Sequence, residues 1–172
     1  MALAFVPAIM NPEDSTLTRL ACLAPIGDRY GKLTAASTNT TTSHAVPLKY
    51  FFALDLHQSA RILPRLIGSI IESIRFLGPL NCALSIVEGR SDDGTFEILV
   101  LLRKEIERIG AHYYLHSHSS DINPTAGNRI RALADLRNQA LQPLLDHADQ
   151  TLTDATTVMF LNDVAICMED IL

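Results

Sequence analysis

The sequence of 172 residues predicts an α/β fold with a Rossmann-like, mostly parallel sheet and helices on both faces. Short apolar runs, rich in β-branched and aromatic residues, alternate with longer segments of helical periodicity in the order β-α-β-α-β-α-β. This alternation favours right-handed crossovers between parallel strands. The composition, 48% apolar and 19% charged, is typical of a globular chain with one substantial core.

The first strand and helix are predicted over residues 49–56 and 60–77. The aromatic and aliphatic run of the strand suits a central position that is covered on both sides. In the helix, apolar residues recur at three- and four-residue spacing, and Pro64 suits its first turn. Gly78, followed by a proline, is predicted to end it.

The second strand is predicted over residues 83–88, where the apolar run is short and bounded by polar residues. An amphipathic helix follows over residues 95–109, with Gly110 just beyond its end. A third strand, with a weaker pattern than the others, is predicted over residues 111–116.

A polar loop then leads to a third helix over residues 128–146, which we expect to be interrupted or to end near Pro143. The fourth strand is predicted over residues 158–161. Residues 169–172 begin a further element.

Residues 1–46 show no sustained periodicity and are predicted to form a stem or linker that is partly disordered. The tract 34–43 is almost entirely Thr, Ser, Ala and Asn, which is typical of a flexible connection and places the domain boundary near Val46. The turn at residues 11–14 offers a start for a helix over residues 16–22.

The charge and hydropathy of the chain exclude two classes of partner. The net charge is −5 at pH 7 and no Lys/Arg cluster is present, so no nucleic-acid surface is predicted. No apolar run reaches the length that spans a bilayer. Residues 1–10 are apolar but short and lack a basic region, so we predict no signal peptide.

The three cysteines, Cys22, Cys82 and Cys167, are odd in number and far apart in the chain. Their spacing indicates neither a zinc site nor a disulfide framework. We therefore expect them to be buried apolar residues.

Acidic and hydroxyl side chains follow the second predicted strand directly: Glu88, Ser91, Asp92 and Asp93. In open α/β sheets, ligands bind at the carboxyl ends of the strands. These side chains could accept hydrogen bonds from the ribose hydroxyls and base N–H groups of a sugar nucleotide, and Gly94 lets the backbone approach closely. Helix capping explains the same residues equally well.

Asn162 and Asp163 follow the fourth predicted strand in the same way. A carboxylate there could hold a hard divalent cation that bridges to a diphosphate. The alternative is an ordinary turn aspartate. Glu169 and Asp170 could add a ligand or cap the next helix.

Arg129, Arg131, Arg137 and Asn138 lie in the third predicted helix. An arginine at this place could reach a diphosphate. The alternative is a solvent-exposed helix face.

His112, His116 and His118 would share one face of a strand, but no carboxylate or cysteine accompanies them, and a zinc site is disfavoured. The chain has no GxSxG, Walker A or GxGxxG motif. A hydrolase triad, a P-loop and a dinucleotide fingerprint are therefore unsupported.

Several segments, in order along the chain, together resemble the fungal capsule-associated α-1,3-mannosyltransferases, the cryptococcal mannosyltransferase-like glycosyltransferases. The segments are YFFALDLHQ, LPRLIGSIIESIRFLGP, NCALSIVEGRSDDGT, SDINP, RIRALADLRNQAL and FLNDVAICMEDIL. The resemblance runs from about Lys49 to the last residue, and PAIMNPEDSTLTRL is similar to the stem before the family's domain.

The resemblance implies a type A glycosyltransferase fold, a GDP-mannose donor, Mn²⁺ (or Mg²⁺) as cofactor, and transfer of mannose to a glycan acceptor. It also implies a Golgi or secretory-pathway location through a membrane anchor that this chain lacks. On this interpretation residues 47–172 are the nucleotide-sugar-binding half of the enzyme. Catalytic groups are unassigned and expected beyond Leu172, so the chain could be inactive.

The resemblance also assigns site residues. Asp92 and Asp93 match the acidic loop that holds the nucleotide part of the donor, and Asp55 matches the end of the first strand, beside the base. Arg129 and Arg137 match the helix that follows.

Asp163, preceded by Asn162, matches the short acidic motif and is the expected metal ligand. The asparagine replaces a first acid of that motif.

Two alternatives stay open. The chain could be a non-catalytic protein that binds a sugar nucleotide, or one whose exposed sheet edge is covered by a protein partner. It could also be a different nucleotide-dependent α/β enzyme, although the phosphate loops of such enzymes are missing.

Overall fold

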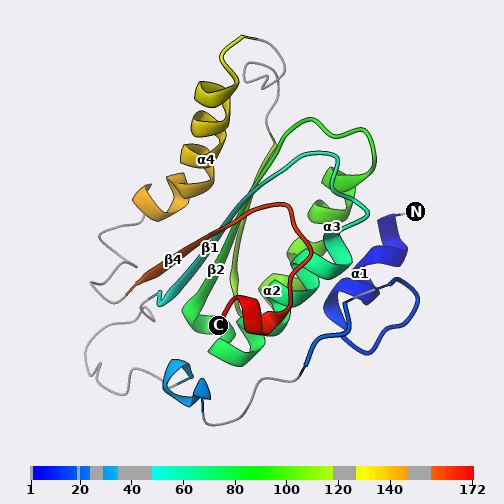
Figure 1. Cartoon of the computed structure of the whole chain (residues 1–172). Coiled ribbons are helices and arrows are strands. Elements are labelled where there is room, and N and C mark those ends of the chain that lie inside the picture. The colour runs from blue at the N-terminus through cyan, green and yellow to red at the C-terminus, as the bar shows by residue number, and fades with distance from the viewer. Residues whose placement is uncertain (1, 19, 24–28, 35–47, 118–126, 147–155) are drawn as a thin grey trace.

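The computed structural model describes residues 2–18, 20–23, 29–34, 48–117, 127–146 and 156–172. Within these ranges, helices and strands alternate along the chain after an N-terminal helix (Figure 1): α1 (Ala2–Met10), β1 (Tyr50–Leu56), α2 (Leu63–Leu77), β2 (Cys82–Glu88), α3 (Thr95–Arg108), β3 (His112–Ser117), α4 (Arg129–Asp146) and β4 (Thr157–Leu161). Short 3-10 helices occur at η2 (Gly31–Leu33), η3 (Pro79–Asn81) and η4 (Met168–Asp170).

The four strands form one parallel sheet in the order β3-β2-β1-β4. This arrangement confirms the predicted α/β class. As predicted, β1 is central: Phe51, Phe52, Ala53 and Leu54 have at most 1% of their surface exposed.

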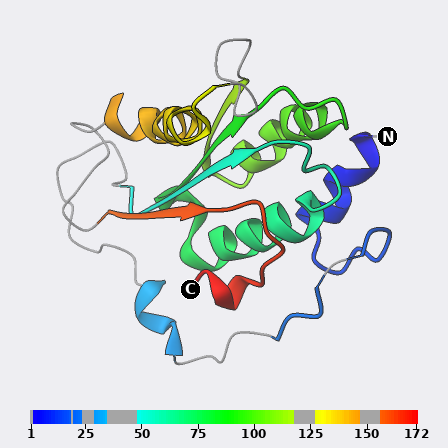
Figure 2. The ribbon, with the colours of Figure 1, turned by 45° about the horizontal axis from the view of Figure 1, so that its top comes forward.

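Helices cover both faces of the sheet (Figure 2), with α2 and α3 on one face and α4 on the other. Successive residues of β1 alternate between these faces. Phe52 and Leu54 belong to the core formed with α2 and α3, whereas Phe51 and Ala53 pack in the core with α4. Asp55 continues the second series, so the strand directs it to the α4 side at the carboxyl end of the sheet.

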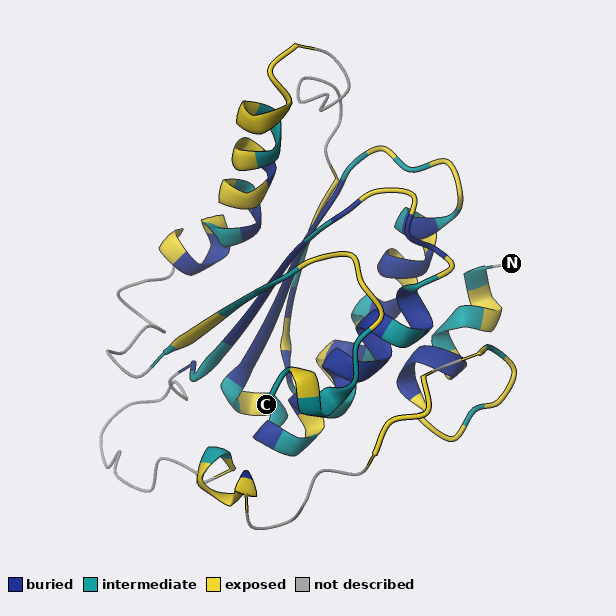
Figure 3. Ribbon diagram, in the orientation of Figure 1, coloured by how far each residue is buried: buried dark blue, intermediate teal, exposed yellow. Residues whose placement is uncertain are grey.

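The outer strand β4 is the least covered part of the sheet (Figure 3). Val158 is 45% exposed, whereas every residue of β2 is buried. The turn after β4, with Asn162 and Asp163, is exposed as well. The carboxyl edge of the sheet is therefore open to solvent on the β4 side.

The predicted helix boundaries are largely confirmed, with one exception. Pro64 lies in the first turn of α2, and Gly78 ends this helix with a φ of +91°, a backbone conformation that glycine adopts without strain. The third helix ends at Asp146, as predicted, but the interruption expected as one possibility at Pro143 does not occur, because α4 continues through this residue. Pro143 is buried in the last turn, where packing against the sheet holds the helix together.

The N-terminal helix α1 was not predicted from the sequence. It packs against α2 and α3, Ile9 is 1% exposed, and the guanidinium of Arg75 donates a hydrogen bond to the carbonyl oxygen of Met10 at 2.6 Å. A nine-residue segment is too short to be stable alone, so tertiary packing decides its conformation. The helix start proposed for residues 16–22 is wrong, since their described part is not helical.

Residues 35–47 lie outside the described ranges. The flexible connection predicted over residues 34–43 and the domain boundary predicted near Val46 therefore stay predictions. Among the described helices, none combines the length and the apolar character that a bilayer crossing requires.

A disulfide joins Cys22 to Cys167, with the two Cα atoms 5.6 Å apart. The prediction of three buried apolar cysteines without a disulfide is therefore wrong for this pair and right for Cys82, which is buried and unpaired. The two partners are separated by 145 residues, so no local spacing in the sequence indicates the bond. The bond ties the N-terminal segment to the chain that follows β4.

Candidate functional site

The parallel sheet brings the ends of β1, β2 and β4 to one edge. Leu54 in β1 is paired with Leu161, the last residue of β4, and Leu56 is paired with Glu88, the last residue of β2. The residues that follow these strands therefore meet at the edge where α/β folds bind ligands.

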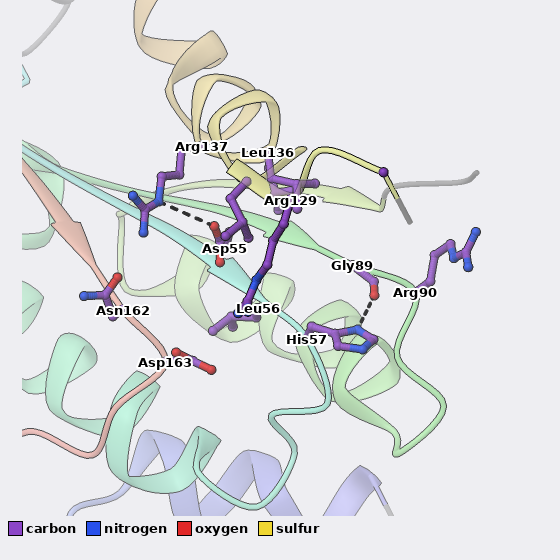
Figure 4. A pocket seen from close by; sticks show the side chains of 13 residues that line it. Asp55, Leu56, His57, Gly89, Arg90, Arg129, Leu136, Arg137, Asn162 and Asp163 are labelled. Carbon is purple, nitrogen blue, oxygen red and sulfur yellow. Dashed lines mark hydrogen bonds and ion pairs between the residues drawn. The ribbon is translucent and has the colours of Figure 1, made fainter. Parts of the chain in front are cut away.

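A cleft of about 920 Å³ lies at this edge, beside the N-terminal half of α4 (Figure 4). Its volume is in the range of small-molecule sites, roughly 300–1,000 Å³. The cleft combines apolar, cationic and anionic groups, and its lining consists of Asp55, Leu56, His57, Val87, Gly89, Arg90, Gly127, Arg129, Leu133, Leu136, Arg137, Asn162 and Asp163.

Asp55 and Arg137 form an ion pair across the cleft, with 3.8 Å between the arginine Nε and the carboxylate Oδ2. The guanidinium of Arg137 also lies 5.5 Å from the centre of the Phe160 ring in β4, at cation–π distance. These two contacts hold a half-exposed arginine in a defined position over the ends of β1 and β4.

The pKa of Asp55 is raised above its ordinary value, chiefly because burial removes water from the carboxylate. The positive charge of Arg137 partly offsets this rise, and the negative charge of Asp163 adds to it. Asp55, near the end of β1, and Asp163, just after the neighbouring strand β4, are therefore close enough to influence each other electrostatically.

Asn162 and Asp163 are exposed on the β4 side of the cleft (Figure 4). Their amide and carboxylate oxygens are the hard ligands that Mg²⁺ and Mn²⁺ prefer. Within the described ranges, no group of three or more His, Cys, Asp or Glu side chains is placed to hold a metal ion. The residues present thus fit a cation that takes few protein ligands and completes its shell from water and a phosphate ligand.

Arg129 begins α4 and lines the cleft, two turns before Arg137. The other two polar residues considered in this helix, Arg131 and Asn138, do not line it. The helix therefore presents two of its arginines to the same space.

The loop after β2 enters the lining of the cleft through Gly89 and Arg90. The predicted site residues of this region, Glu88, Ser91, Asp92 and Asp93, are not in the lining. The buried carboxylate of Glu88 accepts a hydrogen bond from the backbone N–H of Ser91 at 2.7 Å. Asp93 accepts hydrogen bonds from the N–H and the hydroxyl of Thr95, the first residue of α3. The N-cap position of this helix is Gly94, so none of the predicted capping residues occupies it. That these four residues contact a donor stays a prediction.

The pKa of Asp93 is lowered. Desolvation, the largest single influence, acts in the opposite direction, but the hydrogen bonds from Thr95 and from the backbone N–H of Ala60 together outweigh it. Asp93 is therefore a charged structural acceptor at the start of α3.

His112 and His116 lie on β3, as predicted, at the far edge of the sheet from β4, and neither lines the cleft. His118 lies outside the described residues. The described histidines of β3 take no part in the candidate site.

His57, Gly89 and Arg90 also line the cleft, although no pattern in the sequence was taken to predict this. A usable signal was present, because His57 follows β1 just as Asp163 follows β4 within two residues of the strand end.

Comparison with known proteins gives two matches. Residues 49–172 match the family model described as "Cryptococcal mannosyltransferase 1". The chain is also 34% identical over 130 residues to the alpha-1,3-mannosyltransferase CMT1 of Cryptococcus neoformans var. neoformans serotype D. The match covers 72% of this chain and 28% of that relative, so the chain spans less than a third of the relative's length. No solved structure matches the chain.

Proposed function

This chain belongs to the cryptococcal mannosyltransferase family, and on that premise we propose that its cleft binds the nucleotide-sugar donor, GDP-mannose, of an α-1,3-mannosyltransferase. The observation that carries the proposal is the convergence of Asp55, Arg137 and Asp163 in one cleft at the carboxyl edge of a parallel sheet. The name of the relative supports mannose as the transferred sugar, and a glycan acceptor is part of the same proposal.

The arginines of α4 would face the diphosphate of the donor. Arg137 is already held in place by Asp55 and Phe160, so it loses less conformational entropy when an anion binds. Arg129 enters the same cleft from the first turn of the helix. Planar guanidinium groups match the geometry of phosphate oxygens, which supports a diphosphate as the anion.

The apolar part of the lining suits the less polar parts of the donor. Leu136 and Val87 are buried beneath the cleft, and Leu133 is partly buried beside them. Such side chains can pack against a base or a sugar ring, while the few polar groups fix its orientation.

Asp163 would hold the divalent cation, with the amide oxygen of Asn162 as a second candidate ligand. When bound, Mn²⁺ or Mg²⁺ supplies positive charge next to the departing diphosphate. We assign no residue of the described chain as a nucleophile or as a ligand of the acceptor.

A location in the Golgi or another part of the secretory pathway belongs to the same proposal. The disulfide between Cys22 and Cys167 supports it, because structural disulfides persist in oxidising compartments and are rare in the cytosol.

The proposal is tested by calorimetric titration of GDP-mannose in the presence and absence of Mn²⁺. We expect Asp163→Ala to abolish the Mn²⁺-dependent part of the affinity, because the exposed carboxylate is the main protein ligand. Asp135→Ala is the matched control, since it removes an exposed carboxylate from α4 outside the cleft. Equal Mn²⁺-dependent affinity in wild type and Asp163→Ala would remove the metal assignment.

Binding and transfer are separate results. A chain that binds GDP-mannose with Mn²⁺ but releases no GDP in the presence of a mannose-containing glycan is a non-catalytic donor-binding protein, the alternative left open by the sequence.

A further inference from the structure

His57 lies at the rim of the cleft, in the turn between β1 and α2, opposite the Asn162 and Asp163 side (Figure 4). Its ring Nδ1 is hydrogen-bonded to the backbone carbonyl oxygen of Gly89. A carbonyl oxygen can only accept, so Nδ1 carries the hydrogen. In the neutral ring Nε2 then carries a lone pair and is a hydrogen-bond acceptor.

The backbone next to this contact adopts a conformation that side chains other than glycine rarely take. Gln58 has a φ of 53° and Arg90, on the facing loop, has a φ of 51°. These two residues adjoin the two partners of the His57–Gly89 hydrogen bond. Backbone strain of this kind persists only where surrounding contacts enforce it, and it concentrates at functional sites.

The contacts that enforce it come from the acidic loop after β2 and from the first residue of α3. The backbone N–H of Gln58 donates to the Ser91 hydroxyl at 2.8 Å, and its side-chain amide donates to Asp92 at 2.6 Å. The backbone N–H groups of the next two residues donate to Thr95 and to Asp93, both at 2.9 Å. The loop after β2 and the first residue of α3 therefore fix the turn that carries His57, residue by residue.

We propose that His57 binds the donor, accepting at Nε2 a hydrogen bond from a hydroxyl group of the nucleotide sugar. This inference rests on the proposed function. In the neutral ring, the lone pair of Nε2 can accept a hydrogen bond, and the hydroxyl groups of the ribose and of the sugar can donate one. Ser91, Asp92 and Asp93 are then positioning residues, which act on the donor through His57.

The variant that tests the proposal is His57→Asn. An asparagine amide can keep a donor near the position of Nδ1, facing the Gly89 carbonyl, but has no atom at the position of Nε2. In calorimetric titration with GDP-mannose and Mn²⁺, we expect affinity to fall roughly tenfold, the effect of one lost hydrogen bond. His112→Asn is the matched control, because His112 is exposed on β3 outside the cleft and should leave the affinity unchanged.

The ¹⁵N signals of the His57 ring give a second readout in the wild-type chain. We expect the free protein to show the hydrogen on Nδ1, and GDP-mannose with Mg²⁺ to shift the Nε2 signal. A purely structural histidine would show no shift. This measurement decides the question even if His57→Asn fails to fold.

The outcomes separate the two proposals. If wild type binds GDP-mannose and His57→Asn binds it equally well with an unchanged unfolding transition, the role of His57 is overturned and the donor cleft stands. If wild type binds no GDP-mannose, the proposed function and the inference both fail.

Discussion

The disulfide between Cys22 and Cys167 allows a quantitative prediction. It connects the N-terminal segment to η4, where the phenol of Tyr30 also donates a hydrogen bond to Glu169 at 3.1 Å. The change we consider is the double variant Cys22→Ser/Cys167→Ser, which removes the cross-link and leaves both positions polar. We expect it to fold with a lower free energy of unfolding.

The magnitude follows from the length of the closed loop. In the chain-entropy treatment, a cross-link spanning 145 residues lowers the entropy of the unfolded chain by an amount equivalent to about 5 kcal/mol at room temperature. Native disulfides typically contribute about 2–5 kcal/mol, so this is the upper end of the range. With a urea m-value of about 2 kcal/mol per M, the unfolding midpoint would fall by roughly 1–2.5 M.

The assay is equilibrium urea unfolding of wild type and the double variant, each with and without dithiothreitol. Reduced wild type should match the double variant, and the reductant should not affect the double variant. A thiol titration gives independent information, since burial raises the pKa of the Cys82 thiol to about 12 and makes it unreactive in the folded chain. Of the three cysteines, only Cys82 should react after unfolding without reductant.

Two results would refute this reasoning. The disulfide is absent from the protein if three thiols react after unfolding without reductant. If the bond is present but its removal lowers the free energy of unfolding by less than about 1 kcal/mol, the loop-closure argument fails, and the N-terminal segment is held by its other contacts.

Two further predictions concern stability. Asp93→Ala should lower the free energy of unfolding by about 1 kcal/mol at neutral pH, the net effect of a lost hydrogen bond. Because the folded-state pKa of Asp93 is lowered, this stabilisation is complete above the ordinary aspartate pKa of 3.8 and is lost as pH falls through the folded value, so urea curves of the two proteins should converge in acid. Ser85→Ala should leave stability unchanged or raise it by up to about 1 kcal/mol, because the fully buried Ser85 hydroxyl has no hydrogen-bond partner among the described residues; a clear loss of stability in thermal unfolding would show that the hydroxyl has one.

Much of the sheet could be predicted from the sequence because its signals are local. The apolar run of β1 and the helical spacing in α2 each lie within a short window, and their order implies parallel strands. The same logic predicted that the acidic loop after β2, with Asp92, and the turn after β4, with Asp163, would lie at one edge of the sheet, since parallel strands end there. Asp163 lines the cleft at this edge, whereas Asp92 does not, and Asp55 was expected beside the site only from the resemblance to the family. Arg129 and Arg137 were likewise expected near this edge, from the resemblance to the family.

Local patterns could not distinguish a side chain that lines the cleft from one that supports a loop. Asp92 and His57 both follow strands, yet in the structure Asp92 accepts a hydrogen bond from Gln58 while His57 lines the cleft. Which of them faces the cleft depends on the strained turn after β1 and on the loop packed against it. The conformation of the turn and the packing of the loop cannot be predicted from the sequence of one segment alone, because each depends on the other.

The sequence by itself thus determined the α/β class, the alternation of elements and the edge at which polar residues gather, because periodicity is set by neighbouring residues. Only the tertiary structure decided that α1 forms, that Cys22 meets Cys167 and that Arg137 is held between Asp55 and Phe160. Those contacts join segments far apart in the chain, and their free energy exists only once the core has brought the segments together.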